Sequence, residues 1–487
     1  MNIIQQPLYK MLAADDEIIF VLEDTTIIAN NFKVKYIAEV YVHTSGNPFT
    51  ASKVATLKVV PNNAGTGVFD FSRILEAYTS PDYLGGETST SGGTQFFSQY
   101  NQVNFSDTTP HSIHQIDKWS TNRNNVRTVA FKFYIEYSTT ATGTLINTSN
   151  STVNSDTFYI HNAVRQEDDA IAIDSSTGNF GYNYDFNDYV LNASNKKFLS
   201  NAPTTQYIGE NDFCTIGFFA QSDSLLGANS RYGKFIGTSS TRYLIRHIKI
   251  QFYYNGSTTG SLITYSNTTS NGSLTWQSTS SKAQVQYVGV GTGNIKGAGG
   301  SLPTNWDYYE VKAFDYDDVL VSGTYKFHKQ EVCKGFEKFR LCWLNRLGVW
   351  DYFNFTKKNV RKVNSKRETY QQIKGTWNER KYKKHGYQGG KKTFVANAKE
   401  MITLQTDFIT EEAAQWLEEL FTSPDVFMLN ERSTDTSAGT VKNLVNKYVQ
   451  PCIVTTSSYT RKTTANDKLK QYTIEIEMSH NKRIQKA

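Results

Sequence analysis

The sequence predicts a mainly β protein made of several sandwich-like or barrel-like modules, with two short packed helices at about 71–80 and 411–422. Thr, Ser, Asn, Gly, Tyr and Phe are abundant, and aromatic residues make up 14% of the chain. Short runs rich in β-branched and aromatic residues recur along it, and polar turns separate them. Helix-forming residues are scarce elsewhere, so sheets are expected to supply most of the buried surface.

The length of 487 residues corresponds to two to four domains, at about 100–200 residues per domain. Residues 1–84 are expected to form an N-terminal β module with one helix. Residues 85–325 are rich in Ser, Thr and Asn and are expected to form one or more inserted β domains. Residues 326–487 are expected to form a C-terminal β module with an aromatic hairpin, a basic block and the second helix.

Local patterns justify the individual elements. Apolar runs and alternation predict strands at 17–22, 32–42, 54–60, 129–137, 156–161, 213–220, 243–254, 262–265, 283–290, 308–314, 319–327, 399–408, 441–455 and 471–478. Asp70 is a suitable N-cap for the first helix, and Pro81 ends it. Thr410 is expected to cap the second helix, whose Trp416 and Leu417 lie on its apolar side.

The densest cluster of large apolar residues lies at 336–355. Apolar residues alternate at one end of this segment, and Gly348 allows the chain to reverse, so we expect a β-hairpin. Because a hairpin alone is marginally stable in water, its rings need a partner surface on this chain or on another subunit. The expected core or interface anchors are Trp343, Trp350, Tyr352 and Phe353.

Charge is unevenly distributed along the chain. Residues 324–400 contain 20 Lys and Arg against 6 Asp and Glu, an excess of 20 − 6 = 14. Because the formal charge of the whole chain is +6, the remainder carries 6 − 14 = −8. A basic block between acidic flanks can support self-association or contact with an acidic partner. The expected charged contacts with a neighbouring subunit are Lys357, Lys358, Arg361 and Lys362.

No catalytic constellation is recognisable, because the phosphate-loop, nucleophile-elbow and zinc-protease motifs are all missing. His111 and His114 lie in a polar stretch without further ligands, so no metal is expected. Several carboxylates could serve a glycosidase or a calcium site, but the sequence does not pair them. They are Asp168, Asp169, Asp185, Asp188, Asp315, Asp317 and Asp318. We expect no catalytic residue and no cofactor.

The remaining patterns bear on location and partners. The four cysteines form no C-x-x-C pair and are expected to be free thiols. The chain has no run of about 18 apolar residues and no signal peptide pattern, so we expect synthesis in the cytoplasm and no membrane insertion. The basic block with its interleaved aromatics could bind nucleic acid, but it contains no recognised motif. A charged face between subunits explains the same residues, so nucleic acid is not the favoured partner.

Three stretches resemble virion structural proteins of tailed bacteriophages, including crAss-like phages. They are GVFDFSRILE at 67–76, WLNRLGVWDYF at 343–353 and KLKQYTIEIE at 468–477. With their flanking strands they cover about a third of the chain, mainly its ends. The resemblance implies a non-enzymatic tail protein of the virion (a hub, ring or tail-tip/baseplate component) that forms a homo-oligomeric ring with other tail or neck proteins as neighbours.

Two alternatives remain open at this stage. The inserted domain could act as a receptor-binding module that contacts host surface glycans, with Trp276 and Trp306 as the possible glycan contacts. The chain could instead be a polysaccharide-degrading tail enzyme that uses loop carboxylates. A glycan array would support the first alternative, and turnover of host polysaccharide would support the second.

Overall fold

The chain is mainly β and divides into two compact units in a computed structural model. The structure describes residues 1–44, 47–82, 119–121, 124–148, 152–173, 180–220, 245–267, 285–331, 335–431, 449–456, 458 and 470–482. The first unit comprises Met1–Gln330, Leu344–Asp351 and Glu431–Lys442, and the second comprises Glu331–Trp343, Tyr352–Asn430 and Asn443–Ala487. The predicted fold class is confirmed, because several sheets make up the described residues and the helices are short.

Two sheets in the first unit form a β-sandwich. Their strands are β1 (Asn2–Gln5), β2 (Met11–Ala13), β3 (Ile19–Glu23), β4 (Phe32–His43), β5 (Lys53–Val59), β6 (Thr66–Asp70), β8 (Val126–Ser138), β9 (Ile146–Asn147), β10 (Val153–Asn154) and β11 (Phe158–His161). One sheet has the order β1–β3–β6. The other has the order β2–β11–β8–β4–β5, and β9 and β10 also pair with β8.

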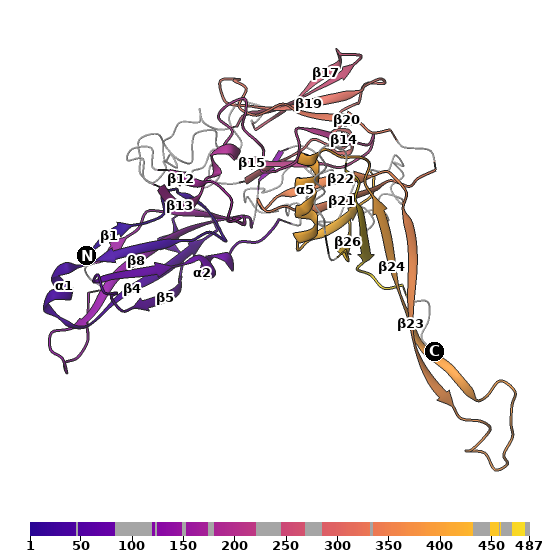
Figure 1. Cartoon of the computed structure of the whole chain (residues 1–487), viewed down its shortest axis with the longest axis horizontal. Coiled ribbons are helices and arrows are strands. Elements are labelled where there is room, and N and C mark those ends of the chain that lie inside the picture. Colours follow the sequence, from indigo (N-terminus) through magenta and orange to yellow (C-terminus); the bar gives the residue numbers. More distant parts are fainter. Residues whose placement is uncertain are drawn as a thin grey trace, which may run out of the picture. The chain divides into compact units, whose positions relative to one another are not determined.

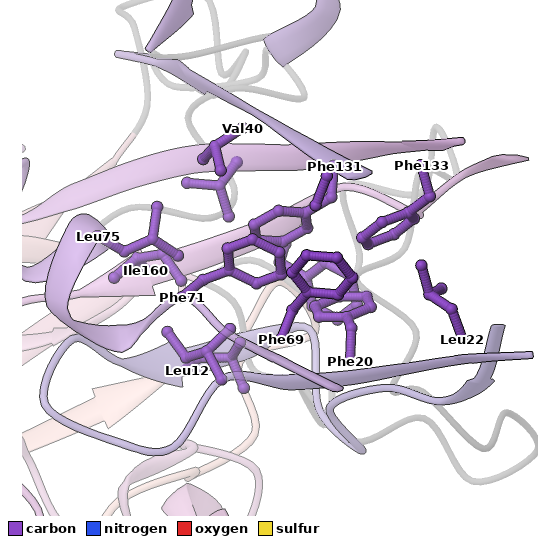
Figure 2. Packing of buried hydrophobic residues seen from close by; sticks show 14 of the residues in the cluster. Leu12, Phe20, Leu22, Val40, Phe69, Phe71, Leu75, Phe131, Phe133 and Ile160 are labelled. Carbon is purple, nitrogen blue, oxygen red and sulfur yellow. The ribbon is translucent and has the colours of Figure 1, made fainter. Parts of the chain in front are cut away.

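A cluster of phenylalanine rings fills the space between these two sheets (Figure 2). The ring centroid of Phe20 on β3 lies 4.7 Å from that of Phe131 on β8. Phe71 stacks on Phe131 at 4.2 Å, and Phe133 lies 5.4 Å from Phe20. Such ring pairs contribute about 0.5–1.5 kcal/mol each beyond the area that they bury. The alternation along β8 therefore places its large apolar side chains in one core.

The first predicted helix is shorter than expected. Helix α2 runs from Ser72 to Glu76, and α1 (Thr25–Asn30) and the 3-10 helix η1 (Pro48–Thr50) lie nearby in the sequence. After α2 the chain continues in a tight turn, in which the backbone N–H of Tyr78 donates to the carbonyl of Leu75. Asp70 still contributes at the start, since its Oδ1 accepts from the Ser72 N–H at 3.0 Å.

The rest of the first unit contains three further sheets. Its elements are β7 (Trp119–Thr121), β12 (Ile171–Ile173), β13 (Phe180–Tyr184), the 3-10 helix η3 (Phe186–Tyr189), β14 (Thr205–Ile208), β15 (Thr215–Phe219), β16 (His247–Tyr254), β17 (Ser257–Ser266), β18 (Val285–Gly289), α4 (Thr292–Gly297), β19 (Tyr308–Phe314) and β20 (Tyr325–Lys329). The sheet orders are β14–β20–β19–β16–β17, β15–β18–β7 and β12–β13.

Strand pairing crosses the limit expected between the N-terminal and inserted domains at residue 84. β8 and β11, at 126–161, complete the sheet that β2, β4 and β5 begin. The register between β4 and β8 places Ala38 opposite Phe133 and Val40 opposite Phe131. The Ser/Thr/Asn-rich composition suggested this domain boundary. Composition of that kind reflects surface residues, whereas the apolar face of a strand decides which strands it pairs with.

The aromatic hairpin brings a segment of the C-terminal part of the chain into the first unit. Residues 344–351 belong to that unit, and Val164 donates its N–H to the carbonyl of Arg346 at 2.8 Å. Asn345 Nδ2 donates to the carbonyl of Leu199 at 2.9 Å. The side chain of Asn345 also stabilises the turn itself, because its Oδ1 accepts from the N–H groups of Leu347 and Val349.

The second unit is built on one sheet and one helix. Its elements are β21 (Phe339–Leu344), β22 (Trp350–Phe355), β23 (Val360–Gln372), β24 (Gly390–Gln405), α5 (Glu411–Thr422), β25 (Val426–Leu429), β26 (Val449–Val454) and β27 (Thr473–Met478). The sheet order is β22–β21–β25–β26–β27–β24–β23. Helix α5 has the bounds that the sequence predicts, and Thr410 caps it by accepting from the Ala413 N–H.

Candidate functional site

A two-stranded ribbon extends from the sheet of the second unit beyond the strand that flanks it (Figure 1). β24 pairs with β23 along the whole of β23, whereas β27 pairs with β24 only over Met401–Gln405. One further bridge joins Ala398 to Lys482. We call residues 364–399 the arm and residues 373–389 its tip. Among the described residues, no third strand runs alongside the arm.

The stem of the arm exposes apolar side chains and open strand edges. The side chains of Tyr370 and Phe394 are 43% and 44% exposed, and Val363, just before the stem, is 56% exposed. Phe394 is the extra residue of a β-bulge opposite the step from Glu368 to Thr369. An exposed strand edge presents unpaired N–H and C=O groups to which another strand can add.

The two faces of the stem differ in chemistry. Side chains alternate between faces along a strand, and directly paired residues share a face. Ser365 pairs with Ala398 and Arg367 pairs with Ala396, so this face carries small side chains together with Arg367. Lys366 and Lys392 lie on the opposite face.

Internal hydrogen bonds order the tip. Thr376 Oγ1 donates to the carbonyl of Lys381 at 3.0 Å and accepts from the Lys383 N–H at 2.8 Å. Gly375 has a φ of 74°, and a Cβ there would lie 2.4 Å from the ring of Tyr382. The tip is therefore a compact loop in which a glycine allows a ring to lie against the backbone.

The ordered tip displays aromatic rings to solvent. Trp377, Tyr382 and Tyr387 are 72%, 57% and 72% exposed. Trp377 Nε1 donates to the carbonyl of Lys374 at 2.7 Å, and its ring lies 5.7 Å from that of Tyr382 in an edge-on arrangement. The rings of His385 and Tyr387 stack at 5.6 Å. These contacts orient the rings without burying them.

The arm is strongly basic. Residues 364–399 contain ten Lys and Arg and two Glu, which gives a net charge of 10 − 2 = +8 with His385 neutral. The cations Lys366, Lys374, Arg380, Lys381, Lys383 and Lys384 are all exposed. Their mutual repulsion opposes burial of the arm against its own unit.

The four cations predicted to contact a neighbour lie at the base of the arm. Lys357 forms an ion pair with Asp407 at 2.9 Å, and Arg361 bridges Glu337 and Glu400. The ammonium group of Lys482 and then the guanidinium of Arg361 lower the pKa of the Glu400 carboxyl. Lys358 and Lys362 are exposed. Their role between subunits stays a prediction.

The four predicted aromatic anchors pack within the same chain. Trp343, Trp350 and Tyr352 are buried and Phe353 is half-buried. Trp343 lies 5.0 Å from Trp416 of α5, ring to ring. Trp350 Nε1 donates to the backbone carbonyl of residue 82 at 3.0 Å, and the Arg340 guanidinium lies 5.1 Å from the Tyr352 ring centroid. These rings form core contacts here, and Phe353 keeps part of its surface exposed.

The two tryptophans proposed for glycan contact have different outcomes. Trp306 is 3% exposed and packs against Phe252 and Tyr309 at 5.5 and 5.9 Å. It therefore offers no free ring face on which a sugar could stack. Trp276 lies outside the described residues, and so do His111 and His114.

Three of the carboxylates considered for catalysis form structural contacts within the chain. Asp169 forms an ion pair with Arg346 at 2.6 Å, Asp185 caps η3, and Asp318 accepts from Lys249 at 2.7 Å. Within the described ranges, no group of three or more His, Cys, Asp and Glu could hold a metal ion.

The described cysteines are buried thiols. They are Cys214, Cys342 and Cys452. Burial raises the pKa of the Cys452 thiol to about 12, so this group stays protonated at neutral pH. In the same part of the chain, every helix is too short or too polar to cross a membrane.

Comparison of the whole chain with protein-family models, curated proteins and solved structures found no match.

Sequence reasoning located the basic block but did not predict a freestanding ribbon. Two signals were present. The segment 360–372 has the length of a strand but lacks a continuous apolar face, and Gly389 and Gly390 mark the point where the second strand begins. Both glycines have positive φ, at 90° and 78°. The rings at 377, 382 and 387 were visible in the sequence, but their exposure was not.

Proposed function

We propose that this chain is a non-enzymatic structural component of a bacteriophage tail that assembles with copies of itself into a ring. The resemblance of its two ends to virion proteins supports a location in the tail. A hub, ring or tail-tip/baseplate position fits that resemblance. The geometry of the arm supports self-assembly. The conclusion is carried by one observation, which is a long β-ribbon without a supporting strand among the described residues.

A ribbon of this kind is costly to keep uncovered in solution. Two strands alone are marginally stable in water, and each ordered residue costs roughly 1–2 kcal/mol of backbone entropy. Packing of this face, where Ser365, Ala396 and Ala398 lie around Arg367, against a neighbouring surface would offset this cost. Burial of the exposed Val363, which lies on the same face at the base of the arm, would remove further apolar area from water.

A second copy of the chain is the partner that we propose. An arm on one copy and a receiving surface on the next make a head-to-tail contact, which closes into a ring when the rotation between copies allows it. Addition of a strand of the neighbouring copy to the edge of β23 would fix the orientation of the two copies through backbone hydrogen bonds. Lys358 and Lys362, at the base of the arm, would then meet acidic groups of the neighbour.

Removal of the arm tests self-assembly. Val363 and Glu400 pair directly across the ribbon, so residues 364–399 can be replaced by an Asn-Gly turn that closes a shorter hairpin. We expect the full chain to form one discrete oligomer in mass photometry and the shortened chain to be monomeric and folded, with a circular dichroism spectrum that differs only by the strand residues removed. A monomeric full chain, or an oligomer that survives the deletion, would contradict the proposal.

The location in the tail requires a separate measurement. We expect peptides of this chain in the tail fraction of disrupted virions, at a constant ratio to the other tail proteins in quantitative mass spectrometry. The capsid fraction is the matched control. Absence from both fractions would exclude a structural role in the particle.

A further inference from the structure

We infer that the arm also binds nucleic acid through the phosphodiester backbone, with the tip rings stacking on bases where these are unpaired. This activity goes beyond assembly. It uses the tip and the face of the stem that carries Lys366 and Lys392, whereas the proposed contact between copies uses the face of Ser365 and Ala398 and the edge of β23.

The positive charges of the arm are spread along its length, which matches the regular spacing of phosphates on a linear polyanion. Its ten Lys and Arg are spread from Lys366 through the tip to Lys399, against two Glu. The paired stem, residues 364–372 with 390–399, spans roughly 30 Å at about 3.3 Å per residue. Neutralising phosphates along such a length releases condensed counterions, which is the main source of sequence-independent binding. A two-stranded ribbon also fits the major groove of duplex DNA.

The tip adds a second, independent feature. Trp377 and Tyr387 are each 72% exposed, while internal contacts fix their orientation. Proteins that hold single strands combine a basic track with such rings, because every base offers a face for stacking. Arg380, Lys381 and Lys383 are exposed in the same tip segment as these rings, so the tip offers a nucleic-acid strand both cations and stacking surfaces.

An anionic membrane is a less suitable occupant. Ile373 is the one exposed aliphatic side chain of the tip, so little surface could enter the acyl region. A membrane would also meet only the charges of the tip and leave Lys366 and Lys392 of the stem unused. A strand that follows the ribbon can reach all of them.

Binding can be measured by fluorescence anisotropy with the full-length protein. The probes are a labelled 30-base-pair duplex and a labelled 30-nucleotide single strand, each titrated from 50 to 200 mM salt. We expect both to bind, with affinity falling linearly on a log–log plot against salt concentration. Absence of binding at 50 mM salt would overturn the inference.

A triple variant tests the charge. Lys381→Gln, Lys383→Gln and Lys384→Gln together should weaken binding at least about tenfold and reduce the duplex salt slope by about 2–3. The matched control removes three exposed lysines outside the arm, with Lys33→Gln, Lys58→Gln and Lys197→Gln. Equal binding by the two triple variants would overturn the inference. Mass photometry should show the same oligomer for both, which separates this test from that of assembly.

The rings are tested on the single strand. Trp377→Ala and Tyr387→Ala should each weaken single-strand binding about tenfold and change duplex binding less than threefold, while Trp377→Phe should restore most of the affinity. Vesicles containing 30% anionic lipid serve as the competing probe. If the lysine variant loses vesicle binding and retains nucleic-acid binding, the tip is a membrane contact and the inference is wrong.

Discussion

His161 shows how burial controls the chemistry of one side chain. It is fully buried, and its Nε2 lies 2.7 Å from the carbonyl oxygen of Leu347, which accepts the hydrogen bond. The rings of Phe186 and Phe219 lie 5.9 and 5.3 Å from the imidazole. Because water cannot solvate the charged form there, burial lowers the pKa of His161 to about 4.

The low pKa of His161 predicts a loss of stability in mild acid. The unfolded chain takes up this proton at about pH 6.5 and the folded chain at about pH 4. The contribution is therefore fully present above pH 6.5 and is lost as the pH falls toward 4, by about 3 kcal/mol in total. Urea unfolding between pH 7 and 4 should show this loss, and His161→Gln should make the slope shallower, while His247 and His328, whose pKa values burial also lowers, keep part of it. His480→Gln, at an exposed position, should keep the slope of the wild type.

The turn of the aromatic hairpin depends on a single glycine. Gly348 has a φ of 75°, and a Cβ there would lie 1.9 Å from the carbonyl oxygen of Asn162. Gly256 has almost the same φ, 76°, but nothing lies within 4 Å of its Cβ position. Comparison of the two positions therefore separates the cost of positive φ from the cost of a backbone clash.

We predict that Gly348→Ala destabilises the protein far more than Gly256→Ala. The second change should cost about 1–2 kcal/mol, from the left-handed backbone alone. The first adds displacement of a backbone carbonyl in a packed region and should cost at least about 3 kcal/mol in total. Thermal unfolding of the two variants provides the measurement. Equal losses of Tm would mean that the hairpin turn is not packed against Asn162.

At the scale of elements, α5 was predictable because its N-cap residue and the helical spacing of its apolar residues indicate the same helix. Thr410 begins it, and the buried residues Trp416, Leu417 and Leu420 recur at helical spacing. The segment after Asp70 has weaker signals, and its helix ends at Glu76. Local signals thus predict where an element begins, while its length depends on what the following residues pack against.

Helix α5 supplies a direct test of element packing. Trp416 lies 5.0 Å from Trp343 and 6.1 Å from Phe353, ring to ring, so one side chain joins the helix to two strands. Trp416→Ala should destabilise the second unit by about 3–5 kcal/mol, because it removes a buried indole. The exposed neighbour Gln415→Ala should stay within about 0.5 kcal/mol. Urea unfolding monitored by tryptophan fluorescence would show the difference, and equal midpoints would contradict this packing.

At the scale of the whole molecule, strand existence was predictable and strand partnership was not. The alternation at 129–137 identified a strand, yet nothing local indicated that it pairs with β4. The hairpin at 336–355 was expected as one element, but its turn groups with the first unit and its flanks with the second. Trp306 is buried because Phe252 and Tyr309 cover it from other strands. These outcomes depend on long-range contacts that composition and periodicity do not contain.

The arm links the scale of the whole molecule to that of its assembly. In a monomer, the amides of 366–372 and 391–397 are protected only by pairing within a lone ribbon, which opens easily. Of the adjoining residues, Met401–Thr403 pair with β27 as well as β23, and Leu404 and Gln405 pair with β27. Hydrogen exchange should therefore be fast in the arm and slow at 401–405 when the protein is dilute.

Assembly should slow hydrogen exchange in the arm but not at 401–405. When the protein concentration is raised until the oligomer forms, we expect exchange at 366–372 and 391–397 to slow at least about tenfold, because a neighbouring copy covers the edge of β23. Exchange at 401–405 is the internal control and should not change. Because burial of the ribbon is the physical reason for self-assembly, an oligomer whose arm still exchanges at the monomer rate would require a different contact between copies.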